Sequence, residues 1–130
     1  MDIPTDRFYS DYHLWVKLEE GTATVGITEH AREELGDVDY VELPQEGDTI
    51  TRGMAFGIIE TSKAVTDLMA PISGQVVESN VSLLESPEAL MDSPYTDGWL
   101  IVVEPADQDE FTELMDSSKY REFLDEAIDQ

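Results

Sequence analysis

The sequence predicts a mostly β fold, a small antiparallel barrel-sandwich with a short internal helix and C-terminal helices. Two observations predict it. Short apolar runs separated by turn residues occupy most of the chain as far as Pro105, and after that point apolar residues recur at helical spacing. Many short strands followed by helices are typical of sheets with helices packed on them. With 130 residues and 41% hydrophobic content, the chain is long enough for one core, so we expect a single domain over residues 1–130.

The N-terminal half is expected to contain a hairpin, a short helix and a third strand. Glu20 and Gly21 supply the hairpin turn. Thr28 has the side chain of a helix cap, and Gly36 is typical of the residue that ends a helix. The expected elements are strands at 13–18 and 22–27, a helix at 29–35 and a strand at 40–43.

The C-terminal half is expected to contain further strands and then two helices. The strands are expected at 54–60, 65–70, 75–79 and 99–103, with a rigid corner at 71–74. Trp99 in the last strand should be at least partly buried. Asp107 and Glu110 have the spacing of a capping box for the first helix, and Ser118 is expected to cap the second.

Acidic residues dominate the charge of the chain. Its 30 acidic and 7 basic residues give a formal net charge of -23. Such a molecule repels nucleic acid and anionic membrane surfaces, so neither is expected as a partner. Because the acids alternate with apolar residues, the charge indicates a folded protein with an acidic surface rather than a disordered tail. We therefore expect a halophilic protein from a salt-rich cytoplasm.

Three further features agree with a cytoplasmic location. The chain contains no cysteine, which excludes disulfides and fits a reducing compartment. No apolar stretch approaches the roughly 20 residues that span a bilayer. The start of the sequence, residues 1–6, has neither the basic beginning nor the apolar centre of a signal peptide.

Lys63 is the residue that points to a function. It lies in a short polar turn between two apolar strands and is one of only three lysines in the chain. Its neighbours Ser62 and Ala64 are small, so they leave the ammonium group accessible. An exposed lysine is protonated at neutral pH and is a poor nucleophile. A separate ligase is therefore needed to acylate it, and acylation turns the side chain into a long neutral arm.

The sequence disfavours two other kinds of site. A hydrolase built on Ser62 and Lys63 is disfavoured because neighbouring side chains in a tight turn diverge. A metal site at His13 and His30 is disfavoured because the two histidines lack ligand spacing in the sequence, and lone histidines are more often structural. We expect no metal.

The segment from Glu60 to Asp67 resembles the lipoyl-lysine hairpin of lipoyl carrier domains. Biotin carriers place a methionine on each side of their lysine, and Ser62 and Ala64 depart from that pattern. The flanks resemble the glycine cleavage system H-protein family, and the fold is accordingly expected to be lipoyl-domain-like. The residues that carry this resemblance are 13–16, 26–28, Ala31, 35–37, 40–44, 47–48, Asn80, Leu84, Pro87, Leu90, 93–95 and 98–100.

The resemblance implies a non-catalytic carrier with lipoate attached to Lys63 through an amide bond. Such a carrier moves the aminomethyl group of glycine between other enzymes. Its implied partners are a pyridoxal-phosphate glycine decarboxylase, a tetrahydrofolate-dependent aminomethyltransferase, the dihydrolipoyl dehydrogenase and a lipoate ligase. An alternative that stays open is a carrier of the same family that acts in lipoyl transfer or with another dehydrogenase complex.

The resemblance also suggests roles for residues around Lys63. Glu60 matches an acid that helps the attaching enzyme recognise the hairpin, although it could equally be a solvated carboxylate. Asp67 matches an acid that lies near the loaded arm, with an ordinary surface charge as the alternative. One departure stands out: Leu14 occupies a position where the family usually has an acid that could contact the loaded arm. Glu34 is a candidate to replace it.

Overall fold

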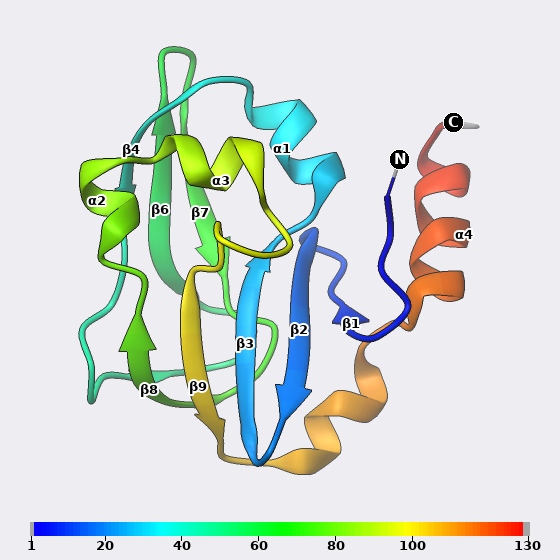
Figure 1. Cartoon of the computed structure of the whole chain (residues 1–130). Helices are drawn as coiled ribbons and strands as arrows, with labels where there is room; N and C mark the ends of the chain where they lie inside the picture. The colour runs from blue at the N-terminus through cyan, green and yellow to red at the C-terminus, as the bar shows by residue number, and fades with distance from the viewer. Residues whose placement is uncertain (1, 129–130) are drawn as a thin grey trace.

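The computed structural model describes residues 2–128, and its strands form two antiparallel sheets (Figure 1). The larger sheet has the order β1-β2-β3-β9-β8-β5, and the smaller has the order β4-β6-β7. The strands are β1 (Phe8–Tyr9), β2 (Leu14–Glu19), β3 (Thr22–Ile27), β4 (Val38–Glu42), β5 (Thr49–Ile50), β6 (Ala55–Thr61), β7 (Val65–Met69), β8 (Gly74–Ser79) and β9 (Ile101–Pro105). The prediction of a mostly β, antiparallel fold is confirmed.

The helices before β9 are short and lie at one end of the sheets, whereas the C-terminal helix lies beside the larger sheet (Figure 1). They are α1 (Glu29–Leu35), α2 (Ser82–Glu85), α3 (Glu88–Asp92), the 3₁₀ helix η1 (Gln108–Glu113) and α4 (Ser117–Ile128). In the described part of the chain, none of them has both the length and the apolar character needed to cross a bilayer.

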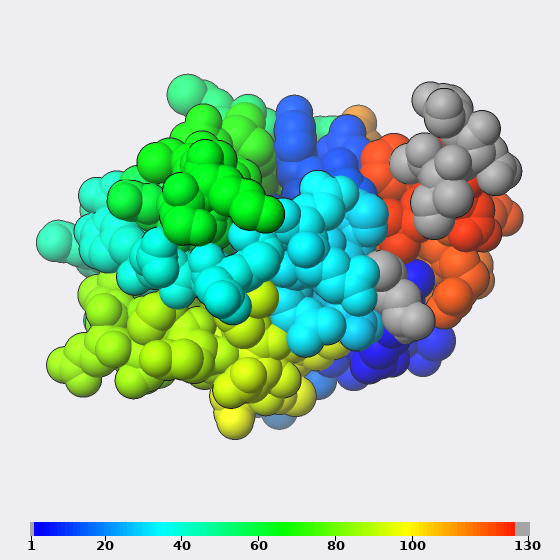
Figure 2. All heavy atoms as spheres, turned by 90° about the horizontal axis from the view of Figure 1, so that it is seen from above, coloured from blue at the N-terminus to red at the C-terminus, as the bar shows by residue number. Residues whose placement is uncertain are grey.

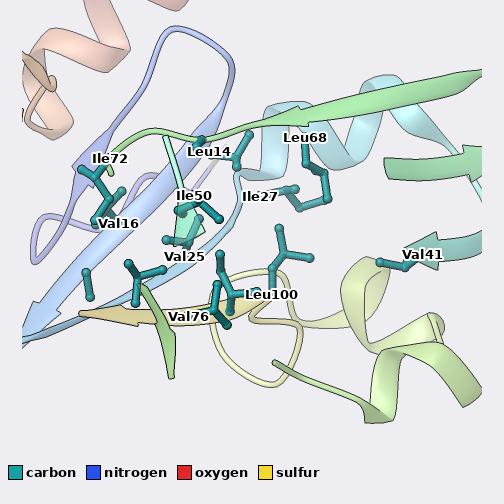
Figure 3. Close-up of a cluster of buried hydrophobic side chains, with 14 of the residues drawn as sticks. Leu14, Val16, Val25, Ile27, Val41, Ile50, Leu68, Ile72, Val76 and Leu100 are labelled. Carbon is teal, nitrogen blue, oxygen red and sulfur yellow. The ribbon is translucent and has the colours of Figure 1, made fainter. Parts of the chain in front are cut away.

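The main core lies between the two sheets (Figure 3). Both sheets contribute fully buried aliphatic side chains to it, such as Val25 from β3 and Ile59 from β6. Burying one such side chain contributes about 1.5–3 kcal/mol to folding. The core therefore ties the β4-β6-β7 sheet, which includes the predicted lysine hairpin, to the rest of the molecule.

A second cluster joins the two ends of the chain. Tyr9 on β1 stacks on Tyr120 of α4, with ring centroids 4.7 Å apart and an interplanar angle of 6°. The backbone N–H groups of Tyr9 and Met115 each donate to the other residue's carbonyl at 2.8 Å. Buried Trp15 and Leu124 complete the contact. The C-terminal helix is thus packed on β1 and β2.

The predicted hairpin and short helix in the N-terminal half are confirmed. The turn between β2 and β3 has positive φ at both Glu20 and Gly21, 49° and 88°, as a two-residue hairpin turn requires. The Thr28 hydroxyl caps α1 by accepting from the Ala31 N–H at 3.2 Å. Gly36 ends the helix with φ 71°, and its N–H donates to the Arg32 carbonyl.

The strand predicted at 99–103 is displaced toward the C-terminus, since β9 runs from Ile101 to Pro105. Trp99 lies before it in a turn, where its N–H donates to the Thr96 carbonyl at 3.2 Å. The Asn80 amide donates to the Trp99 carbonyl at 2.7 Å, and so holds it out of the sheet. Trp99 is half-buried against the second cluster, which confirms the prediction of partial burial.

Of the caps predicted near the C-terminus, the Asp107 cap is confirmed, whereas the Glu110 half of the capping box and the Ser118 cap are wrong. Asp107 does cap η1, accepting from the Asp109 N–H at 2.9 Å. Glu110 does not complete a capping box, because its carboxylate accepts from the Ser73 N–H and hydroxyl at 2.7 and 2.9 Å. At α4, Asp116 instead of Ser118 accepts from the Lys119 N–H, at 2.8 Å. The contact with Ser73 fastens η1 to the predicted corner at 71–74.

Four elements were not predicted: β1, β5, α2 and α3. Each has between two and five residues. The other strand boundaries agree with the predicted ones to within two residues. The domain predicted over 1–130 also includes Met1, Asp129 and Gln130, which lie outside the described residues.

Candidate functional site

The β6-β7 hairpin projects beyond the rest of the fold and presents its turn to solvent (Figure 1). Cross-strand pairs Glu60–Val65 and Ile59–Thr66 run up to the turn. The Thr61 N–H donates to the Ala64 carbonyl at 2.9 Å. The Thr61 hydroxyl oxygen accepts from the N–H groups of Lys63 and Ala64 at 3.2 and 3.3 Å. Side-chain and backbone bonds therefore fix the turn that carries Lys63.

Lys63 differs from Lys17 in its surroundings. Lys17 is on β2, where its Nζ lies 3.5 Å from Asp6 and 3.0 Å from Glu19. The hydrogen bond to the Glu19 carboxylate raises the pKa of Lys17. Lys63 is exposed and takes part in none of the ion pairs found among residues 2–128. Its ammonium group is accessible to a modifying enzyme.

Glu60 and Asp67 are both exposed side chains of the hairpin. Glu60 pairs with Val65 across the hairpin, and Asp67 pairs with Ile58. Because cross-strand partners share a face and alternate residues change face, the two carboxylates lie on the face opposite the buried Ile59. Glu60 is close to the turn along the strand, whereas Asp67 lies further down the hairpin.

A mainly apolar cavity of ≈ 320 Å³ adjoins the hairpin. Its walls come from β7, from α1 and from the turn before β2. Seen from above, the hairpin and α1 lie on the same face of the molecule, with α4 on the far side of α1 from the hairpin (Figure 2). The lining residues are Asp11, Tyr12, His13, Leu14, Ile27, Ala31, Glu34, Leu35, Ile59, Thr66, Asp67, Leu68 and Met69.

This cavity brings together residues that lie far apart in the sequence. Asp67 and Glu34 both line it, from β7 and α1. Leu14 also lines it and belongs to the main core. The position held by Leu14 therefore contributes apolar surface, and three acidic residues, Asp11, Glu34 and Asp67, are among those that line the cavity.

His13 and His30 lie against each other in the fold, although they lack ligand spacing in the sequence. Their ring centroids are 4.3 Å apart. His13 Nδ1 shares a hydrogen bond with the Tyr120 hydroxyl at 2.8 Å. Burial, and then the neighbouring His30, lower the pKa of His13. His30 Nε2 pairs with the Glu34 carboxylate on the same helix. No signal in the linear sequence reveals this proximity, because it depends on how α1 packs against the turn before β2.

Comparisons with known proteins agree with the lipoyl-carrier geometry. The family model described as "Glycine cleavage H-protein" matches residues 7–127. A "Glycine cleavage system H protein" of Anaeromyxobacter sp. (strain K) is 44% identical over 126 residues, covering 97% of this chain and 98% of the relative. "Glycine cleavage system H protein 2, mitochondrial" of Arabidopsis thaliana is 50% identical over 121 residues, covering 93% of this chain and 78% of the relative.

A solved structure shares the fold. The crystal structure of a glycine cleavage system H protein from Mycobacterium marinum superposes with a TM-score of 0.84 and is 40% identical in sequence. The match covers 91% of this chain and 95% of that chain. The resemblance predicted from the hairpin and its flanks is confirmed. On these grounds the chain belongs to the glycine cleavage H-protein family.

Proposed function

We propose that Lys63 is the lipoyl attachment site of this carrier. The observation that carries the proposal is a single exposed lysine at the apex of a hydrogen-bonded hairpin, in a chain of this family. Proteins of the family hold lipoate covalently and are carriers without catalytic activity of their own. Here an amide bond to Lys63 Nζ would hold the group, which supplies the disulfide and dithiol chemistry when bound.

The residues present fit a flexible acyl arm on Lys63. The small side chains of Ser62 and Ala64 leave space around Nζ, and the exposed turn gives partner enzymes access. The adjoining cavity of ≈ 320 Å³ has apolar walls that suit a hydrocarbon chain. The residues of this chain would therefore have two roles. The hydrogen-bonded turn fixes the backbone that carries the arm, and the cavity offers the arm a place out of solvent.

The partners follow from membership of the family. Glycine cleavage H proteins work with glycine decarboxylase, aminomethyltransferase and dihydrolipoyl dehydrogenase, and a lipoate ligase modifies them. The carrier moves the aminomethyl group of glycine between these enzymes. Tethering keeps the transferred group at high effective concentration near each partner.

Three acidic residues have proposed roles around the arm. Glu60 lies at the end of β6 and is exposed to the attaching enzyme, which suits it to recognition of the hairpin. Asp67 and Glu34 line the cavity and would attract a positively charged group carried on the arm. Glu34 thereby compensates for the apolar Leu14.

The domain organisation, the source and the cellular location are proposed from the cores and the composition of the chain. A single lipoyl-carrier domain over residues 1–130 fits cores shared by strands from across the chain. A net charge of -23 favours a halophilic source with a salt-rich interior. The lack of cysteine fits a cytoplasmic location.

The attachment site can be tested by lipoylation in vitro. Incubation with a lipoate ligase, lipoate and ATP should add one lipoyl mass to the chain, and Lys63→Arg should accept none. Lys17→Arg and Lys119→Arg are matched controls that should be modified normally. Glu60→Gln should slow the transfer and leave the melting temperature unchanged. Intact-mass spectrometry and peptide mapping measure both results; modification at Lys17 or Lys119 would refute the assignment of Lys63.

The role in glycine cleavage is tested separately from the attachment site. Lipoylated protein should support glycine–bicarbonate exchange by its cognate glycine decarboxylase, and unmodified Lys63→Arg should not. The alternative is a carrier that serves lipoyl transfer or another dehydrogenase complex. Full lipoylation without any exchange would favour that alternative.

A further inference from the structure

Two histidines and a glutamate from two segments converge beside the cavity. One ring nitrogen of His13, one of His30 and one carboxylate oxygen of Glu34 all lie within 4.8 Å of one another. Within residues 2–128, this is the one group of at least three histidine or acidic side chains with such spacing. Imidazole nitrogen and carboxylate oxygen are the ligands that zinc and related divalent ions prefer.

Helix geometry brings two of the three side chains together. His30 and Glu34 are four residues apart on α1, so they lie one above the other on one face. The His30 Nε2 atom already pairs with the Glu34 carboxylate. The side chain of His30 is 23% exposed and that of Glu34 is 65% exposed, so an ion could reach them from solvent and both could rotate toward it.

The third side chain is held by an unusual backbone conformation. His13 has φ 66°, in the left-handed region that few non-glycine residues occupy. Two hydrogen bonds maintain it: the His13 N–H donates to the Ser10 carbonyl at 3.1 Å, and the Thr28 N–H donates to the His13 carbonyl at 3.1 Å. This backbone conformation accompanies the placement of the His13 ring against His30. Strained residues of this kind concentrate at functional sites.

A hydrogen-bond chain orients the His13 ring. The Tyr120 hydroxyl bonds to His13 Nδ1 and to the Thr28 hydroxyl, both at 2.8 Å. Thr28 also caps α1, the helix that carries the other two side chains. With Nδ1 engaged, Nε2 is the nitrogen left free to bind a metal. Metal-bound histidines typically use their second nitrogen in this way, which fixes the orientation of the ring.

We propose that His13, His30 and Glu34 form a binding site for a divalent ion of the zinc class, with one further position open to water or another ligand. Ligand bonds of about 2.0–2.1 Å in a tetrahedral site place ligand atoms about 3.4 Å apart. To reach this geometry, the ligand atoms must each move by about 1 Å from their observed positions. Rotation of the His30 and Glu34 side chains supplies these shifts. The ion replaces any proton shared by His30 and Glu34. Two imidazole ligands favour zinc, cobalt or nickel over magnesium and calcium.

The acidic surface sets the conditions of the test. Thirty acidic residues attract divalent cations without any specific site, so the titration uses about 1 M KCl, which screens such attraction, and excess Mg²⁺. Cobalt(II) is the probe, and the protein is the full chain without lipoate or affinity tag. We expect one Co²⁺ per chain, with visible d–d absorption that one equivalent of Zn²⁺ removes.

Matched variants distinguish specific binding at this site from non-specific binding to the acidic surface. His30→Gln should weaken Zn²⁺ binding by more than about 100-fold, beyond the usual effect of losing an outer partner. Tyr120→Phe should weaken it by about tenfold, because Tyr120 only positions His13. Glu33→Gln, a neighbouring exposed residue on the same helix, should bind as the parent does. Lys63→Arg should also bind normally, so this proposal and lipoyl attachment can fail independently.

Two outcomes would overturn the proposal. The first is no saturable Co²⁺ binding by a parent chain that is folded by near-ultraviolet circular dichroism. The second is several ions per chain with equal affinity in the parent and in His30→Gln. Either result would mean that His30 and Glu34 form only a helix ion pair, and that His13 serves only to bond Tyr120.

Discussion

The two tryptophans show how burial determines the contribution of a single residue to stability. Trp15 is 2% exposed, and its indole N–H donates to the Pro94 carbonyl at 3.0 Å. A Cβ at Gly26 would approach the ring to 2.5 Å, so the glycine is what leaves space for the indole. The Arg7 guanidinium covers the ring at 4.6 Å from its centroid. Trp99, by contrast, is only half-buried against the second cluster.

This contrast predicts different losses of stability. Trp15→Ala should lower the free energy of unfolding by about 3–5 kcal/mol, because it leaves a cavity and an unpaired Pro94 carbonyl. Trp99→Ala should cost no more than about half as much, since part of its ring already faces water. Denaturant unfolding at fixed salt measures both. If Trp15→Ala fails to fold, Trp15→Phe keeps the comparison available; an equal or larger loss for Trp99→Ala would contradict the packing described here.

At the scale of one element, the β6-β7 hairpin depends on Thr61. Its hydroxyl oxygen accepts from two N–H groups of the turn, those of Lys63 and Ala64. Without this acceptor, the turn keeps a single backbone bond, from the Thr61 N–H to the Ala64 carbonyl. If a lipoylating enzyme recognises the shape of the turn, its rate should therefore depend on Thr61, although Thr61 itself is not modified.

Thr61→Val tests this with almost no change in volume. Backbone amides of Lys63 and Ala64 should exchange with solvent about five- to tenfold faster, matching the loss of about 1 kcal/mol per hydrogen bond. The lipoylation rate should fall while the melting temperature changes little. Thr61→Ser retains the hydroxyl and should behave like the parent. Hydrogen exchange measured by NMR decides the matter, and unchanged exchange in Thr61→Val would show that the backbone bond alone fixes the turn.

The elements that could be predicted from the sequence are those with a repeating pattern or distinctive turn chemistry. The β2-β3 hairpin was predictable because Glu20 and Gly21 stand between two alternating strands. Helix α1 was predictable because Thr28 and Gly36 mark its two ends. In contrast, β1 and β5 have two residues each, too few to show alternation. Their pairing is decided by partners far along the chain.

In the candidate site, too, features marked by local sequence could be predicted and features formed by packing could not. The place of Lys63 in a hairpin turn could be predicted because the feature that marks it, a lysine between small residues flanked by two apolar strands, is local. The cavity could not, since β7, α1 and the turn before β2 meet there only in the folded chain. His13 and His30 are separated by the whole β2-β3 hairpin, so their contact is likewise a result of packing. Glu110 was misassigned because a long-range bond to Ser73 replaced the local cap.

At the scale of the whole molecule, the acidic side chains lie on the surface. Among residues 2–126 every aspartate and glutamate is exposed, except Glu29 and Glu110, which are half-buried. With a net charge of -23, the folded state brings like charges together in dilute buffer. At about 1 M salt the screening length falls to about 3 Å, and most of this repulsion disappears.

The melting temperature should therefore rise steeply between dilute buffer and molar KCl. Because salt also strengthens apolar burial in any protein, a neutralised variant is the control. Changing about ten carboxylates to amides should stabilise the protein in dilute buffer and reduce its salt dependence, since it lowers the like-charge repulsion. Suitable exposed residues without ion pairs or side-chain hydrogen bonds in the structure are Asp39, Glu42, Glu46, Glu78, Glu85, Glu88, Asp92, Glu104, Glu122 and Asp125. Equal salt responses in the two proteins would rule out the electrostatic explanation.

The order of the smaller sheet has a consequence for how copies of the carrier meet. Strand β7 lies at the edge of the β4-β6-β7 sheet, so its outer backbone groups are open to pairing with another strand. Two copies joined edge to edge would bring their β6-β7 hairpins into one continuous sheet and hinder access to the turn of each that carries Lys63. Natural sheets discourage this by placing charges on edge strands. Exposed Asp67 sits in the middle of β7, a position where a charge opposes pairing between the edges of two copies.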